Sequence, residues 1–362
     1  MNKKMLTLTA AAVLSTSAAF AADVRMFGHA HLDLRVNAPD SYGTVNSNDS
    51  TLGFRVSADF SDFKAYFKHT FLVDGFDGDS LLGENDASYF NIYGDFGSVR
   101  VGHQPTSASL AYLFTGNNHL PDSIADFSNV GFTEYEQTKA FVYELPVYSG
   151  FTLALGVNAN GDTTKKLFSS PSIGLMYDEG HGLKLGFGYE VIDDRGLDLI
   201  AQYLNQVEGL NVGPQASNSK MLQLGGSYEF DNIMVGAQFE QTQNLLVAES
   251  VASSRYGIIP QDGVDRTSFG VSGKLTFGNN ALSVNLGTEK IEDDAGNEAN
   301  NHFASIALNH TINKRVNTYI AFRNKHGDVA DLQTILKNGV TSQEIENLVR
   351  QRAVAIGMQY KF

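Results

Sequence analysis

The side chains of this 362-residue sequence that could do chemistry are spaced in ways that support little catalysis. His29 and His31 form an H-x-H pair, and in a strand both rings would share one face and could chelate a metal ion. No third ligand has a diagnostic spacing, so polar residues that line an interior are the better interpretation. No G-x-S-x-G motif occurs, and no His stands in a defensible nucleophile–base pattern. We therefore expect no enzyme, no cofactor and no metal site.

Charged residues offer a different chemistry, because many of them recur at alternate positions on one face. Arg55 and Lys68 fall near the middle of alternating segments, whereas Arg25 and Lys64 fall near one end. Acidic residues occur in the long stretch 105–137. Opposed rows of acids and bases across a passage set up a transverse field, which orients dipolar solutes. The basic candidates are Arg35, Arg55, Lys68 and Arg100, and the acidic candidates are Asp122, Asp126, Glu134 and Glu136.

The segments that must position these charges alternate between apolar and polar residues with period two, which is typical of β-strands. In residues 51–60, for example, Leu52, Phe54 and Val56 share one side and Arg55 lies on the other. The longer segments reach the ~9–11 residues that a tilted membrane strand needs. Strands are predicted at 24–36, 51–60, 63–73, 88–96, 98–104, 138–145, 150–158, 172–178, 183–192, 219–230, 233–243, 267–277, 281–290, 302–312, 316–324 and 351–362.

The connections between these strands alternate between short and long. Seven are short and carry Gly, Asn, Asp or Pro, as tight turns require, and eight are long and polar. Fifteen connections imply sixteen strands, and short turns at one end with long loops at the other are typical of an outer-membrane barrel. Residues 196–204 could form an extra strand. An eighteen-strand barrel is then the alternative, if a further strand lies in a long loop.

A large soluble β-sandwich or propeller would show the same alternation in single strands. Aromatic residues near strand ends, such as Phe60, Phe96 and Phe277, favour a barrel with an interfacial girdle. The chain also ends on an alternating strand whose last residue is Phe362. Barrel closure would pair that strand with residues 24–36 and leave no edge. We therefore predict an all-β fold, a 16-stranded antiparallel transmembrane β-barrel.

Residues 1–21 are typical of a secretory signal peptide, with Lys3 and Lys4 before a short apolar stretch and small residues at its end. A membrane anchor is the less favoured alternative. Removal of this segment changes the formal net charge from −14 to −16, and a negative charge argues against nucleic acid as a partner. The sequence has no Cys and hence no disulfides. No linker divides residues 22–362, which we expect to form one barrel domain.

Five stretches stand out as motifs. They are VRMFGHAHLDLRV (24–36), YGDFGSVRVGHQ (93–104), VYELPVYSGFTLALGV (142–157), YEFDNIMVGAQFE (228–240) and the terminal strand that ends in Phe362. With them the mature chain resembles the general diffusion porins of Gram-negative outer membranes. The resemblance implies a trimer of sixteen-stranded barrels with short periplasmic turns and long external loops. It also implies that Phe362 is the signal read by the machinery that inserts barrels into the outer membrane.

The resemblance further implies that the third long loop, 105–137, folds into the lumen and narrows it. Apolar residues would pack this loop against the inner wall and leave its acids facing the passage. They are Leu113, Phe114, Leu120, Ile124 and Phe127. In the last long loop, residues 328–350 contain apolar positions at helical spacing, which predicts one or two short helices.

The predicted function is a water-filled channel for passive diffusion of small hydrophilic solutes and ions. The expected partners are these solutes and ions, outer-membrane lipid and lipopolysaccharide, the barrel-assembly machinery and further copies of the chain in a homotrimer. A substrate-specific channel, for example one selective for sugars, is the alternative. It stays open because Tyr66, Tyr89 and Tyr93 fall on the lumen side.

Overall fold

The computed structural model describes residues 23–38, 43–47, 50–73, 85–117, 124–125, 136–159, 168–192, 219–245, 264–293, 295–327 and 351–362. Within these residues it has one helix, α2 (Ser107–Phe114), and seventeen strands. The strands are β1 (Asp23–Ala38), β2 (Gly43–Ser47), β3 (Thr51–Asp59), β4 (Phe63–Leu72), β5 (Asn85–Gly94), β6 (Gly97–Pro105), β7 (Glu136–Glu144), β8 (Phe151–Ala159), β9 (Phe168–Asp178), β10 (Leu183–Ile192), β11 (Ser219–Phe230), β12 (Ile233–Leu245), β13 (Val264–Phe277), β14 (Asn280–Asp293), β15 (Glu298–Asn313), β16 (Val316–Gly327) and β17 (Gln351–Lys361).

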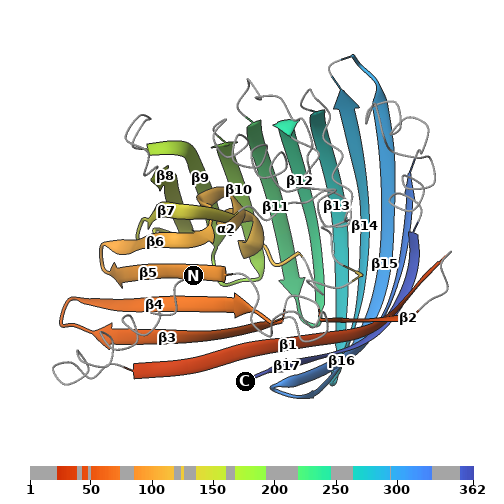
Figure 1. Cartoon of the computed structure of the whole chain (residues 1–362), viewed down its shortest axis with the longest axis horizontal. Helices are drawn as coiled ribbons and strands as arrows, with labels where there is room; N and C mark the ends of the chain where they lie inside the picture. The colour runs from red at the N-terminus through yellow and green to blue at the C-terminus, as the bar shows by residue number, and fades with distance from the viewer. Residues whose placement is uncertain are drawn as a thin grey trace, which may run out of the picture.

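The described strands form a closed antiparallel barrel with sixteen strand positions, or staves, around its circumference (Figure 1). β2 and β3 count as one stave, because both pair with the same edge of β1, at Leu32–Val36 and at Asp23–His29. The other edge of β1 pairs with β17, from His29 opposite Lys361 to Ala38 opposite Arg352. This pairing closes the sheet and confirms the predicted partner of the terminal strand. No sheet edge remains along that seam.

The barrel is apolar outside and polar inside, which follows from the alternation in each strand. On β1, Leu34 and Val36 point outward and are 51% and 44% exposed, whereas His31 and Asp33 point inward and are almost fully buried. The same inversion recurs around the barrel, since Phe90, Phe187 and many other outward apolar residues are exposed. A soluble sandwich or propeller would bury such residues in a core. An exposed apolar belt of this extent suits a lipid environment.

Aromatic side chains gather at the end of the barrel where the short turns lie. The rings of Phe60 and Phe63 stack with centroids 4.5 Å apart on either side of the first turn. Similar pairs are Phe151 with Tyr177, Tyr228 with Phe230, and Tyr360 with Phe362. The girdle predicted from the sequence is therefore present at this end.

One stretch of the chain differs from the sequence prediction, and two further predicted features lie outside the described residues. Residues 37–50 were expected to be a loop, but part of that stretch forms β2 and continues the β1 pairing. The unassigned stretch 196–204 and the helices predicted for 328–350 fall outside the described residues. None of the described residues forms a helix long and apolar enough to cross a membrane.

Candidate functional site: the lumen of the barrel

A helix that the sequence analysis missed lies inside the lumen. α2 follows directly from β6 and packs on the inward faces of β9, β10 and β11 (Figure 1). Thr106 caps its N-terminus, because its side-chain oxygen accepts a hydrogen bond from the Ser109 amide. The same hydroxyl donates to the Glu190 carboxylate at 2.7 Å. The local signal in the sequence was Thr106 before SASLAYLF, a cap residue followed by good helix formers.

Glycines form the surface on which this helix rests. A Cβ atom at Gly174 or Gly186 would collide with the backbone carbonyl of Ser107 or Ala111, and one at Gly188 would lie 2.6 Å from the Ala108 oxygen. All three glycines face inward, so the helix backbone approaches the wall without a side chain between them. Only a residue without Cβ permits this approach.

Beyond α2 the chain continues along the inner wall. The Ser227 hydroxyl on β11 donates to the Thr115 carbonyl at 2.6 Å, and the Asn117 amide donates to the Ala237 carbonyl of β12 at 3.0 Å. Further along, the Ala125 carbonyl accepts hydrogen bonds from the Asn285 amide on β14 and the Ser305 hydroxyl on β15. The described part of the segment 105–125 therefore follows the wall from β8 to β15.

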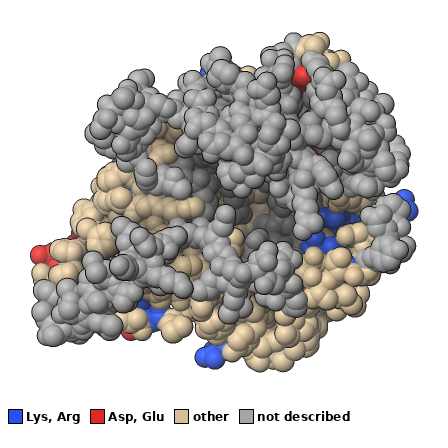
Figure 2. Space-filling model, in the orientation of Figure 1, with Lys and Arg blue, Asp and Glu red and all other residues tan. Residues whose placement is uncertain are grey.

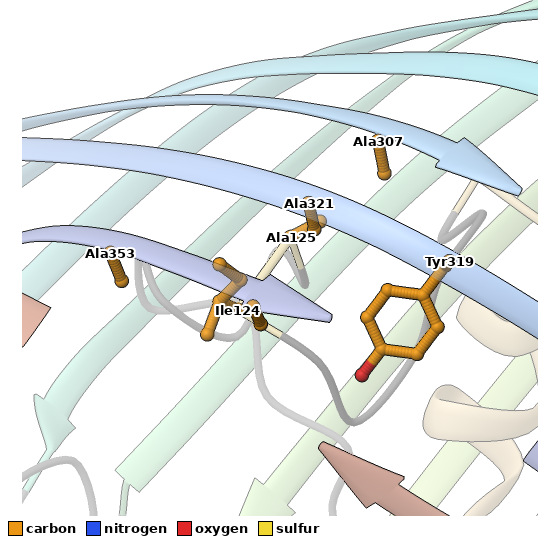
Figure 3. Packing of buried hydrophobic residues seen from close by; sticks show 7 residues of the cluster. Ile124, Ala125, Ala307, Tyr319, Ala321 and Ala353 are labelled. Atoms are coloured by element: carbon orange, nitrogen blue, oxygen red, sulfur yellow. The ribbon is translucent and has the colours of Figure 1, made fainter. Parts of the chain in front are cut away.

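The tip of this segment packs into an apolar patch made by the last three strands (Figure 3). Ile124 is fully buried, and it lies with Ala125 against inward residues of β15, β16 and β17. These inward residues are Ala307, Tyr319, Ala321, Ala353 and Ala355. Small alanines leave room for the segment at this wall, as glycines do under α2. We call the inward faces of β8–β17 the covered arc.

The apolar residues that were expected to pack the loop against the inner wall differ in how far they are buried. Ile124 is buried as expected, and Phe114 packs beside Ala111, Ala154 and Met176. Leu113 is 38% exposed, so its predicted packing against the wall is wrong. Leu120 and Phe127 lie outside the described residues. The helix backbone lies directly on glycines of β9 and β10, and Ile124 packs against alanines of the last strands; the sequence analysis did not consider either contact.

The predicted basic residues all point into the lumen. The register of β1, β3 and β4 places Arg25, Arg55 and Lys68 in one row across these strands. Arg100 on β6 lies opposite Asn91, which in turn lies opposite Tyr66, so all three share the inward face. We use the name open arc for a group of side chains on this inward face, which are Phe27, Arg55, Tyr66, Lys68, Tyr89 and Arg100.

The four basic candidates differ in how their charges are satisfied. Arg100 forms an ion pair with Glu144, and Arg35 forms one with Asp33 at 3.3 Å. Arg55 instead lies over the Tyr66 ring, with its guanidinium carbon 3.9 Å from the ring centroid. Lys68 lies 5.7 and 5.8 Å from the ring centroids of Phe27 and Tyr89. Figure 2 shows a group of Lys and Arg atoms to the right of a hollow in the molecule, across from the side where Figure 1 draws β3–β6.

The predicted acidic residues are mostly outside the part of the chain that the structure describes. Asp122, Asp126 and Glu134 fall in undescribed stretches. Glu136 begins β7 opposite Pro105, but its side chain is not described. The role of these four residues therefore stays a prediction.

The covered arc has buried acids of its own, which the sequence analysis did not single out. Glu240 on β12 pairs with Arg266 on β13 at 2.6 Å and accepts a hydrogen bond from the Gln223 amide at 2.8 Å. Glu289 accepts a hydrogen bond from the Asn301 amide. These carboxylates are buried and already have partners. Only the register between strands brings the partners together, so no local motif marks them.

The H-x-H pair lies at the closure seam. His31 is fully buried, and its ring nitrogen lies 2.8 Å from the Tyr319 hydroxyl, which donates to Asp33 at 3.1 Å. His29 lies next to it, with ring centroids 5.7 Å apart. No cluster of three or more His, Cys, Asp or Glu suited to a metal occurs among the described residues. The two histidines belong to a polar interior, as the sequence favoured.

Phe362 is held at the start of β1. Its amide and carbonyl exchange two 3.1 Å hydrogen bonds with the backbone of Gly28. The Phe362 ring occupies the position that a side chain at residue 28 would need. The last residue is thus part of the closure rather than a free end.

A closed barrel that is apolar outside, polar inside and lined by an inserted segment defines a membrane channel protein. The profile of Gram-negative porins matches residues 7–330. The chain therefore belongs to the Gram-negative porin family and is an outer-membrane β-barrel channel. No curated protein matches the chain by sequence.

Solved structures of similar fold agree with this assignment. OmpF of Salmonella typhi, in complex with daunomycin, has a TM-score of 0.67 at 12% identity, covering 94% of this chain and 97% of its own. The anion-selective porin from Comamonas acidovorans has a TM-score of 0.64 at 17% identity, covering 94% and 100%. A loop-deletion mutant of the outer-membrane protein OmpT of Vibrio cholerae has a TM-score of 0.64 at 13% identity, with the same coverage. At these identities the likeness concerns the fold.

Proposed function

We propose that this porin is a general diffusion channel for small hydrophilic solutes and ions. The observation that carries the proposal is the position of residues 105–117 and 124–125 along one side of the lumen. A sixteen-stave barrel is wide enough for an aqueous channel, and an element fixed at its inner wall narrows the passage. In this proposal residues 1–21 are a signal peptide, 22–362 form the barrel domain and 105–137 form the constriction loop. We propose no catalytic role for this chain.

The proposed constriction has a basic wall and an acidic loop. Arg35, Arg55, Lys68 and Arg100 supply the basic wall, and their inward orientation supports this role. Asp122, Asp126, Glu134 and Glu136 are proposed to face them from the loop. Opposed rows of this kind favour small polar solutes over apolar ones, because only a dipole or ion gains energy from the field.

We propose a homotrimer that contacts outer-membrane lipid and lipopolysaccharide. One of the solved OmpT structures of similar fold is described as a trimer form, which supports the proposal by analogy. Phe362 is proposed as the signal for the barrel-assembly machinery. Deleting Phe362 should then lower the amount of barrel in the outer membrane, measured by immunoblot of membrane fractions, more than it lowers the conductance of each inserted channel. Normal outer-membrane levels of the truncated chain would contradict this role.

The alternative function is a substrate-specific channel. Tyr66, Tyr89 and Tyr93 point into the lumen, but their rings meet edge to face, with centroids 6.0 Å apart and interplanar angles of 65° and 67°. Sugar channels need ring faces along the passage, and the Tyr66 face is already occupied by Arg55. This arrangement favours general diffusion over a sugar pathway.

Single-channel recording and liposome swelling test the proposal. The purified protein in a planar bilayer should conduct in three coupled steps per insertion, as a trimer requires. Swelling rates for neutral sugars of increasing size should fall smoothly with solute mass. Saturable preference for one sugar would instead favour the substrate-specific alternative, and the absence of any conductance would contradict a channel.

A further inference from the structure

Two like charges lie directly opposite each other in the open arc. Arg55 on β3 and Lys68 on β4 are register partners, and both point into the lumen. No ion pair formed among the described residues includes either of them. Like charges in this cross-strand position repel each other and destabilise the pairing. An anion between them would remove that repulsion.

Aromatic rings surround the two charges. The Arg55 guanidinium stacks on Tyr66, and the Lys68 ammonium lies between the rings of Phe27 and Tyr89. Cation–π contacts hold both charges in place without neutralising them. The rings also provide an apolar surface next to a site that attracts anions.

The position of Phe27 is set by a glycine on the neighbouring strand. Phe27 lies opposite Gly53 in the register, and a Cβ atom there would lie 2.6 Å from the tip of the Phe27 ring. The ring therefore rests on the β3 backbone, two residues along from Arg25 and, across the register, from Arg55 and Lys68. The Phe27 ring faces the lumen, so it does not contribute to the apolar belt that faces lipid. Its position beside two cations therefore suggests a role in the lumen.

We propose that the open arc contains a binding station for small aromatic carboxylates. The carboxylate would bridge Arg55 and Lys68, and the aromatic ring would lie against Phe27. Two cations and a flat apolar surface together match the two ends of such a solute. The inference rests on the proposed channel, because the station lies on the diffusion path. It goes beyond that function by naming a solute class that binds on the way through.

The first test compares three anions on the unmodified channel. Chloride current is recorded in a bilayer while benzoate, cyclohexanecarboxylate or acetate is added at constant ionic strength and pH 7. The proposal predicts a half-inhibiting concentration for benzoate about tenfold below that for acetate, with cyclohexanecarboxylate between them. Equal values for benzoate and acetate would overturn the station. This comparison needs no variant, so it does not depend on the folding of mutants.

Variants then assign the station to its residues. Phe27→Leu should raise the half-inhibiting concentration of benzoate towards that of cyclohexanecarboxylate and leave acetate unchanged. Arg55→Gln with Lys68→Gln should weaken inhibition by all three anions. The control is Lys64→Gln, because Lys64 faces the lumen near the short turn and pairs with Asp59 at 3.8 Å. It should leave all three values unchanged.

The outcomes separate the station from the channel itself. A protein that conducts and is inhibited by benzoate, but whose double variant is inhibited equally well, would overturn the assignment to Arg55 and Lys68. A protein that conducts with no difference among the anions would overturn the station and leave the channel. A protein without conductance would overturn the proposed channel function itself.

Discussion

The two arcs of the lumen wall differ in the size and charge of their side chains. The covered arc presents Gly174, Gly186, Gly188 and a row of alanines, and a segment of the chain lies directly on it. The open arc presents arginine, lysine, tyrosine and phenylalanine side chains. Small residues at one wall let the backbone of the inserted segment approach it. Large charged residues at the other wall keep that side polar for solutes.

The comparison also teaches how charge is used in this barrel. On the covered arc, Arg266 and Glu240 are buried and paired with each other, so their charges serve the structure. On the open arc, Arg55 and Lys68 are half-buried, with Arg55 over the Tyr66 ring and Lys68 near the rings of Phe27 and Tyr89, so their charges remain available to ions. Substitutions on the first arc should therefore change stability, and substitutions on the second should change transport.

The largest effect is expected where a side chain would displace the inserted helix. Gly174→Val places a Cβ atom where the Ser107 carbonyl oxygen lies, and backbone atoms cannot move aside as a flexible side chain can. We expect the free energy of unfolding to fall by about 1–3 kcal/mol, because overpacking strains the barrel wall. The measurement is the temperature at which the folded band disappears in a heat-modifiability gel, together with single-channel conductance.

The matched control for this variant is Gly273→Val. A Cβ atom at Gly273 has no other atom within 4 Å, so the same change should be tolerated there. If Gly174→Val and Gly273→Val unfold at the same temperature and conduct equally, α2 does not rest on the wall.

The buried ion pair of the covered arc should come next. Arg266→Met removes the cation that pairs with the Glu240 carboxylate, whose side chain is 1% exposed. The free energy of unfolding should fall by about 3–5 kcal/mol, because a buried charge loses its partner. The control is Arg25→Met, since the Arg25–Asp23 pair is largely exposed and should contribute about 0–1 kcal/mol. Urea unfolding followed by tryptic digestion measures both. Equal losses in the two variants would show that the covered arc has no special role in stability.

A smaller effect, on transport alone, is expected from the open arc. Arg55→Ala with Lys68→Ala removes two positive charges and should shift the reversal potential in a KCl gradient towards cations. At about 10 Å in water with about 0.1 M salt, each charge raises the local anion concentration and lowers the local cation concentration about 1.3-fold, so loss of both charges should change the cation-to-anion permeability ratio about threefold. Lys184→Ala is the control, because Lys184 faces the lumen from the covered arc near Asp178 and Phe114. An unchanged reversal potential in the double variant would remove Arg55 and Lys68 from the passage.

Much of the barrel could be predicted from the sequence, because the period-two pattern depends only on which face meets lipid and which meets water. The predicted strands and short turns are all present among the described residues. β2 was missed because GTVNS is short and does not alternate clearly. The inward orientation of Arg55 and Lys68 followed from the same alternation and is confirmed.

The contacts within the lumen could not be predicted, because they depend on register and closure. An inward glycine such as Gly186 looks like a plain gap until the helix above it is known. His31 and Tyr319 are 288 residues apart and meet only because β1 pairs with β17 and β17 with β16. The same holds for Glu240 and Arg266, whose pairing requires the register of β12 and β13.

The central claim is that solutes pass along the open arc while the covered arc is sealed by the inserted segment. Because the chain has no native cysteine, single-cysteine variants test it directly with a charged methanethiosulfonate reagent added to open channels in a bilayer. Lys68→Cys should react and change the current, whereas Ala154→Cys, at a fully buried position beside Ala111, should react only after unfolding. Equal reactivity at both positions, or reaction at Ala154→Cys alone, would contradict the account.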